Sequence, residues 1–200
     1  MFRPSARLKG MGIGGLFLAG FGGLWMLAAL NSLSWVWLVA CDVVPASLLA
    51  LRSISLIVTS RELAAAEPPP STEEAAAARR LGRRFGWVVM IEFGAIAIAA
   101  NLLAQFGRAD WILAAIGFIV GAHFIPMARV YKFRLYYWTG GIEMALCGAI
   151  ALLMRQRLPL ADPLFGLVMA LTLWATVVLL LAQGAHLAAR VKAAAPSASP

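Results

Sequence analysis

Charged residues and chemically reactive groups are scarce in this chain. Only 13% of the 200 residues are charged, and there are two cysteines and two histidines. The sequence has no Gly-x-Ser-x-Gly, no His-Glu-x-x-His, no Walker sequence and no Cys-x-x-Cys. These motifs carry serine hydrolysis, zinc proteolysis, nucleotide binding and thiol redox chemistry, respectively. An enzyme is therefore the least favoured class of protein, and no cofactor is expected.

The few cysteines also argue against a disulfide framework. Cys41 and Cys147 both fall inside long apolar stretches, where a thiol usually behaves as a small hydrophobic group. They indicate neither a cross-link nor a redox compartment.

Long apolar stretches make up most of the chain. Hydrophobic residues account for 62% of the sequence, and the mean hydropathy is +0.84. A helix needs roughly 20 apolar residues to cross a hydrocarbon core of about 30 Å. Six stretches approach this length: residues 11–30, 35–58, 86–106, 111–128, 137–154 and 163–185. We expect an all-α membrane protein, a bundle of six transmembrane helices that forms a single domain over residues 1–200.

The basic residues are unevenly divided between the two sides of the predicted membrane. One side receives most of them: Arg3, Arg7, Lys9, Arg52, Arg61, Arg79, Arg80, Arg83, Arg84, Arg129, Lys132, Arg134, Arg190 and Lys192. The other side receives Arg108, Arg155 and Arg157. Because cytoplasmic loops carry the excess of Lys and Arg, both termini should be cytoplasmic. The net charge of +8 then reflects membrane topology rather than nucleic-acid binding.

Tryptophans fit the same orientation. Trp35, Trp37 and Trp111 lie at the predicted outer ends of spans, and Trp87 and Trp138 at the inner ends. Such aromatic belts mark the two membrane–water interfaces.

Two segments are expected outside the bilayer. Residues 61–84 form a cytoplasmic linker, in which Pro68 to Pro70 favour an extended spacer. Ser71, with Glu74 three residues later, has the form of a capping box. It predicts a helix that starts near residue 72 and runs into the third span. Residues 193–200 form a low-complexity tail that we expect to be disordered.

Small residues recur at four-residue intervals in three of the predicted spans. They are Gly15, Ala19 and Gly23 in the first, Gly117 and Gly121 in the fourth, and Gly141, Ala145 and Ala149 in the fifth. Faces of this kind allow a neighbouring helix to approach closely. The neighbour can belong to the same chain or to another subunit, and the sequence leaves both open.

Four ionisable residues fall at a similar depth in four different spans: Arg52, Glu92, His123 and Glu143. With a helical rise of about 1.5 Å per residue, each lies about 8–10 Å below the inner interface. An ionisable side chain at mid-bilayer costs about 2.5–3.5 kcal/mol on the insertion scale and marks a candidate functional site. We predict a ligand- or proton-binding site formed by Glu92, His123 and Glu143, with Arg52 as the counter-charge.

The same side chains permit other interpretations. Two carboxylates and an imidazole can relay protons, bind a cation or coordinate a divalent metal, so a metal site stays open. Long polar side chains this close to an interface can also snorkel, or pair only to hold helices together.

A second polar level lies nearer the outer surface, with Asp42 in the second span and Asn101 in the third. Asn101 follows Glu92 by nine residues, which places the two on opposite faces of the helix. One cavity should therefore not connect both levels through that helix.

Two prolines interrupt spans beside polar residues. Pro45 and Pro126 each remove the hydrogen bond to the carbonyl four residues earlier, next to Asp42 and His123 respectively. Broken spans often line binding sites in transporters, although they also occur in inert helices.

The segment from Gly121 to Gly141 contains Gly-Ala-His-Phe-Ile-Pro-Met-Ala-Arg and, further on, Tyr-Tyr-Trp-Thr-Gly-Gly. It resembles a segment of small uncharacterised bacterial multi-pass membrane proteins that carry a His-Phe-x-Pro-x-Ala-Arg pattern. The resemblance implies a location in the bacterial inner (plasma) membrane. It transfers no catalytic role to any residue.

Two functional classes fit these features. The first is a small transporter or permeation protein whose inner polar residues bind a proton, a cation or a small polar solute. The second is a membrane scaffold or subunit that packs against a partner through its glycine-rich faces. The expected partners are the lipid bilayer and either a second copy of the chain or another membrane protein, and not nucleic acid.

Overall fold

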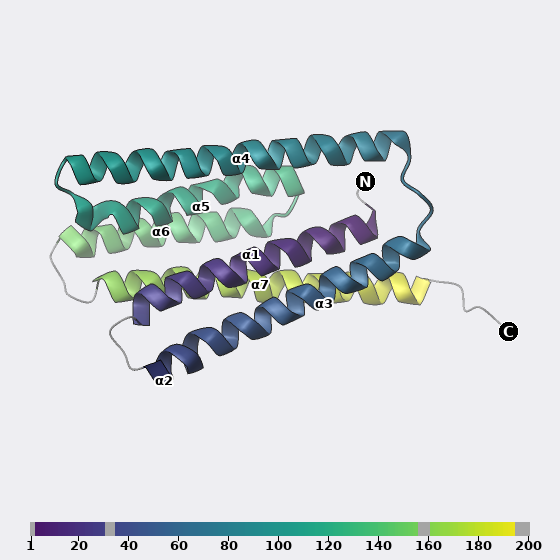
Figure 1. Ribbon diagram of the computed structural model, residues 1–200, viewed down its shortest axis with the longest axis horizontal. Coiled ribbons are helices and arrows are strands. Elements are labelled where there is room, and N and C mark those ends of the chain that lie inside the picture. Colours follow the sequence, from purple (N-terminus) through teal and green to yellow (C-terminus); the bar gives the residue numbers. More distant parts are fainter. Residues whose placement is uncertain (1–2, 31–34, 156–160, 195–200) are drawn as a thin grey trace. The chain divides into compact units, whose positions relative to one another are not determined.

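A computed structural model describes residues 3–30, 35–155 and 161–194, and these residues contain helices and no strand (Figure 1). The elements are α1 (Pro4–Leu30), α2 (Trp35–Leu38), the π-helix η1 (Val39–Val43), α3 (Val44–Ala66), α4 (Thr72–Gln105), the 3₁₀ turn η2 (Ala109–Trp111), α5 (Ile112–Tyr131), α6 (Leu135–Arg155) and α7 (Ala161–Ala194). The all-α prediction is confirmed.

Five segments in the described part of the chain are long and apolar enough to cross a membrane. They run over Pro4–Leu30, Trp35–Ala66, Thr72–Gln105, Ala109–Tyr131 and Pro163–Ala194. The helix at the fifth predicted span, α6, is not among them. Arg157 and residues 195–200 of the predicted tail lie outside the described residues, whereas Ala193 and Ala194 belong to α7.

The chain divides into two compact units. The first comprises residues 1–69 and 173–200, and the second comprises residues 70–172. The first therefore contains α1 to α3 and most of α7, and the second contains α4 to α6 and the start of α7. The single membrane domain expected from the sequence stays a prediction.

In the first unit, the small residues of α1 let α3 and α7 approach closely. A Cβ on Gly15 would lie 2.6 Å from Ser53 Oγ, and one on Gly23 would lie 3.1 Å from Asp42 Oδ1. The indole N–H of Trp174 donates to the carbonyl of Ala19 at 3.2 Å. The face predicted from Gly15, Ala19 and Gly23 is thus filled by helices of the same chain.

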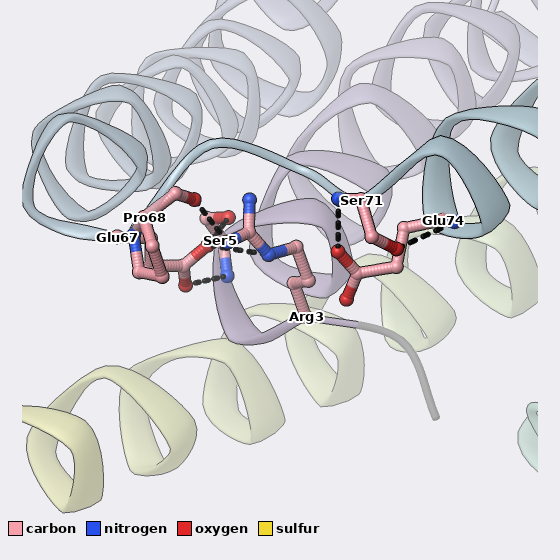
Figure 2. A network of polar contacts seen from close by, with 6 residues as sticks. All are labelled: Arg3, Ser5, Glu67, Pro68, Ser71 and Glu74. Carbon is pink, nitrogen blue, oxygen red and sulfur yellow. Dashed lines mark hydrogen bonds and ion pairs between the residues drawn. The ribbon is translucent and has the colours of Figure 1, made fainter.

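The start of α1 is tied to the end of α3 by Glu67 (Figure 2). The backbone N–H and the hydroxyl of Ser5 donate to the Glu67 carboxylate at 3.2 and 2.6 Å. Arg3 Nε lies 3.5 Å from the same carboxylate, and the Arg3 guanidinium also donates to the carbonyl of Pro68. A carboxylate at the N-terminus of a helix satisfies free N–H groups and is stabilised by the helix dipole.

The predicted capping box is confirmed. Ser71 Oγ accepts from the backbone N–H of Glu74 at 3.2 Å, and the Glu74 carboxylate accepts from the N–H of Ser71 at 2.9 Å (Figure 2). From this cap α4 continues without a break over 34 residues. Of the predicted linker 61–84, only the extended stretch 67–71 separates two helices.

In the second unit, α5 contacts both α4 and α6. The closest approach of α5 and α6 occurs where Gly140 packs against the carbonyl of Gly121. Gly141, Ala145 and Ala149 are exposed, and nothing lies within 4 Å of a Cβ placed on Gly141, so packing of this face against another subunit stays a prediction. The buried face starts one residue earlier, with Gly140, Glu143, Cys147 and Ile150.

Candidate functional site

Glu92 of α4 and His123 of α5 meet in the second unit. Glu92 Oε2 lies 3.1 Å from His123 Nδ1, and the two side chains are 15% and 12% exposed. This distance is that of an ion pair, yet the buried Nδ1 makes no hydrogen bond within the described residues. The carboxylate therefore lies close to the ring nitrogen, but its geometry is not that of a hydrogen bond. Nδ1 of His123 can still form a hydrogen bond with another group.

Glu143 of α6 is fully buried, and it has no polar partner. Its exposed fraction is 0%, and neither carboxylate oxygen has a hydrogen-bond partner in the described part of the chain. Leaving a buried polar group unpaired costs about 1–3 kcal/mol, and more if it is charged. A proton, a cation or a donor group from outside these residues is needed to satisfy this carboxyl group.

The packing of α5 against α6 explains why Glu143 is shut off from solvent. A Cβ on Gly121 would lie 3.1 Å from the Cβ of Glu143 and 3.1 Å from the backbone nitrogen of Met144. Glycine at position 121 lets the backbone of α6 come this near without crowding. The predicted packing role of Gly121 is therefore also what encloses the carboxyl group.

Electrostatic interaction links Glu143 to the Glu92–His123 pair. The carboxyl groups of Glu143 and Glu92 are near enough to repel each other when both are charged. We call Glu92, His123 and Glu143 the polar cluster. Its members come from three successive helices, and their role as one binding site stays a prediction.

Two further features lie near the polar cluster along α6 and α5. One turn beyond Glu143 on α6, the buried Cys147 has its Sγ 3.9 Å from Met169 Sδ. The helix α5 passes through Pro126 without ending, and a proline at this position cannot donate to the carbonyl of Ala122, the residue before His123. A free backbone acceptor is thus available beside the imidazole.

The other predicted site residues are not part of the polar cluster. Arg52 is an exposed residue of α3, in the first unit, so its role as a counter-charge stays a prediction. Asp42 is buried in η1 of the first unit, where the π-turn immediately precedes Pro45. Asn101 is exposed on α4, and its side-chain amide donates to the carbonyl of Ala97 at 2.8 Å.

Metal binding finds no support in the described residues, which contain no group of three or more His, Cys, Asp and Glu side chains that could hold a metal ion. Two acids and one base at the interface of three helices are suited instead to holding and passing a proton. The sequence did not single out Gly140 or the contact between Cys147 and Met169. The glycine pair at 140–141 is visible in the sequence, but the sequence does not show which of the two glycines faces α5.

Comparison with known proteins identifies the family and leaves its activity open. The chain belongs to a family of unknown function (DUF7010), whose model matches residues 77–183. The matched part includes the whole polar cluster and excludes Arg52, Asp42 and the glycine face of α1. No curated protein and no solved structure matches the chain.

Proposed function

We propose that the chain is a multi-pass protein of a bacterial inner membrane, with six spans and both termini in the cytoplasm. The exposed apolar surface supports this proposal, since α4 has no buried residue and carries exposed Trp87, Met90 and Ile98. A soluble monomer rarely exposes apolar patches of this extent. The division of basic residues, 14 against three of the 17, supports the orientation.

Labelling of single cysteines tests the orientation. In a chain whose two native cysteines are replaced by alanine, Ala77→Cys should react only from the cytoplasmic side with a membrane-impermeant maleimide. Arg108→Cys should react only from the outside. Both positions are exposed in the structure. Labelling of both from the same side contradicts the proposed topology.

Within that membrane protein, the polar cluster serves as the proton-binding site of a small transporter or permeation protein. The observation that carries this proposal is Glu143, a fully buried carboxyl group whose two oxygens have no partner among the described residues. A purely structural pair would leave no such group unsatisfied. Glu92 and His123 lie beside it as a second acid and a base through which a proton can arrive or leave.

Proton flux into proteoliposomes tests this function. The full chain is reconstituted with a pH-sensitive dye inside the vesicles, and a pH step is applied with valinomycin and potassium present to cancel the membrane potential. Because a positioned proton-transfer group typically contributes at least about 100-fold to a rate, Glu143→Gln should reduce the flux to near the vesicle background. Asn101→Ala is the matched control, since that side chain bonds only to its own helix, and it should retain the wild-type flux.

The alternative function, a scaffold that docks a partner through its glycine faces, predicts a different result. Wild-type protein would then give no flux above that of empty vesicles, and Glu143→Gln would leave assembly unchanged. The faces of Gly15 and Gly23 are already filled by α3, by η1 and by α7 of the same chain. This packing favours the first function over the second.

A further inference from the structure

The third and fourth turns of α4 carry an arginine cluster that the proton site does not use. Arg79, Arg80, Arg83 and Arg84 follow one another at spacings of one, three and one residues. Residues three and four apart share a face of a helix, so the four guanidinium groups form one continuous stripe. All four are exposed.

Within the part of the chain that the structure describes, no acidic residue pairs with this stripe. Among the described residues, none of the four arginines takes part in an ion pair or hydrogen bond. The nearest carboxylates along the helix are Glu73 and Glu74, and Glu74 is engaged in the cap of Ser71. Arg79, Arg80 and Arg83, with Ala76, also border a hollow of about 490 Å³ on the surface of α4.

The position of the stripe relative to the apolar part of α4 is fixed by packing. Phe85, the residue after Arg84, has its ring 6.0 Å from that of Tyr131 at the end of α5. Figure 1 shows α4 continuing beyond the end of α5, its neighbour in the second unit. Exposed Trp87 follows two residues after Phe85. The stripe therefore lies directly before the level at which the predicted span begins.

We infer that Arg79, Arg80, Arg83 and Arg84 form a binding site for the phosphate headgroups of anionic phospholipids in the cytoplasmic leaflet. Clusters of four to eight basic residues next to a span bind anionic lipids through the negative surface potential of the membrane. Guanidinium groups match phosphate because their planar N–H groups can donate two parallel hydrogen bonds. The inference assumes the membrane location proposed above but not the proton site.

Lipid retention by the detergent-solubilised full chain tests the inference. Native mass spectrometry measures the fraction of protein that keeps phosphatidylglycerol or phosphatidylcholine when both are added in equal amounts. We expect wild-type protein to prefer phosphatidylglycerol. Each arginine near the surface should contribute about five-fold to that preference, so R79Q/R83Q should lose at least about ten-fold and the four-fold glutamine variant should lose the preference.

A matched variant, R190Q/K192Q, removes two basic residues from the end of α7, outside the stripe, and should lose less of the preference than R79Q/R83Q. Since the four arginines make no ion pair or hydrogen bond within the described residues, the glutamine variants should melt at the wild-type temperature. Equal retention of both lipids by wild-type protein overturns the inference, and so does an unchanged preference in the four-fold variant. Displacement of phosphatidylglycerol by millimolar inorganic phosphate would also overturn it, because the stripe would then bind a soluble anion.

Discussion

Oε2 of Glu92 lies 3.1 Å from Nδ1 of His123, and this contact joins α4 to α5 inside the second unit. A third ionisable group, Glu143 on α6, is fully buried nearby and has no hydrogen-bond partner among the described residues. The three helices thus enclose polar side chains that do not form hydrogen bonds with one another. Buried polar groups without hydrogen-bond partners destabilise the fold. The proposed proton-binding function accounts for their presence.

Removing the carboxyl group of Glu143 should stabilise the protein while abolishing flux. Glu143→Met replaces an unpaired polar group with an apolar side chain of similar size, so we expect the free energy of unfolding to rise by about 1–3 kcal/mol. Thermal unfolding in detergent measures the change. A Glu143→Met variant that is clearly less stable than wild type would show that the carboxyl group has a structural partner.

Glu92 and His123 should be energetically coupled. In a double-mutant cycle with Glu92→Gln and His123→Asn, residues in contact typically show an interaction free energy of at least about 0.5 kcal/mol. The free energies of unfolding of wild type, both single variants and the double variant give this value. A cycle with Asn101→Ala in place of His123→Asn serves as the control and should show additive effects. Additivity in the Glu92–His123 cycle as well would mean that the contact has no energetic role.

The two neighbouring glycines at the start of α6 should respond oppositely to alanine. A Cβ on Gly140 would meet the carbonyl of Gly121, whereas a Cβ on Gly141 would meet nothing within 4 Å. We expect Gly140→Ala to destabilise by about 1–3 kcal/mol through overpacking, and Gly141→Ala to stabilise by about 0.5–1 kcal/mol through helix propensity. The melting temperatures of the two variants measure these changes in stability. Equal changes would contradict the close contact between Gly140 of α6 and Gly121 of α5.

Glu67 should stabilise the first unit. Glu67→Gln keeps a hydrogen-bond acceptor for Ser5 but removes the charge that faces Arg3 and the N-terminus of α1. We expect a loss of about 0.5–1 kcal/mol, since the pair is partly open to solvent and the helix-dipole effect is of this size. The loss should shrink in high salt. Glu73→Gln, on an exposed residue, is the control, and an equal effect there would assign the loss to net charge alone.

The sequence predicted the helices because a long apolar stretch is a local pattern. It also singled out Glu92, His123 and Glu143 by their common depth along the spans, and their role as one site stays a prediction. The capping box at Ser71 and Glu74 was predictable as a local pattern as well, since it needs only residues three apart. The register of α6 was not, because Gly140 and Gly141 are adjacent and only Gly141 starts a row of small residues, which is the exposed row. The choice depends on which row faces Gly121 of α5, and that is a tertiary contact.

The unpaired state of Glu143 was equally beyond the sequence. A carboxyl group within an apolar stretch can be satisfied by any neighbouring helix, and only the packed arrangement shows that no described residue does so. Arg52 illustrates the reverse case. It shares the predicted depth of the polar cluster, but depth along a span carries no information about which face the side chain occupies or which unit its helix joins.

In the proposed function, Glu143 exchanges a proton with the aqueous phase. Infrared difference spectroscopy on the reconstituted full chain, with a pH step as the trigger, observes the carbonyl stretch of a protonated carboxyl group directly. We predict a carboxyl band that changes with the pH step, disappears in Glu143→Gln and persists in the Glu73→Gln control. A spectrum with no carboxyl change attributable to Glu143 at any pH at which the protein stays folded would contradict the proton-binding function.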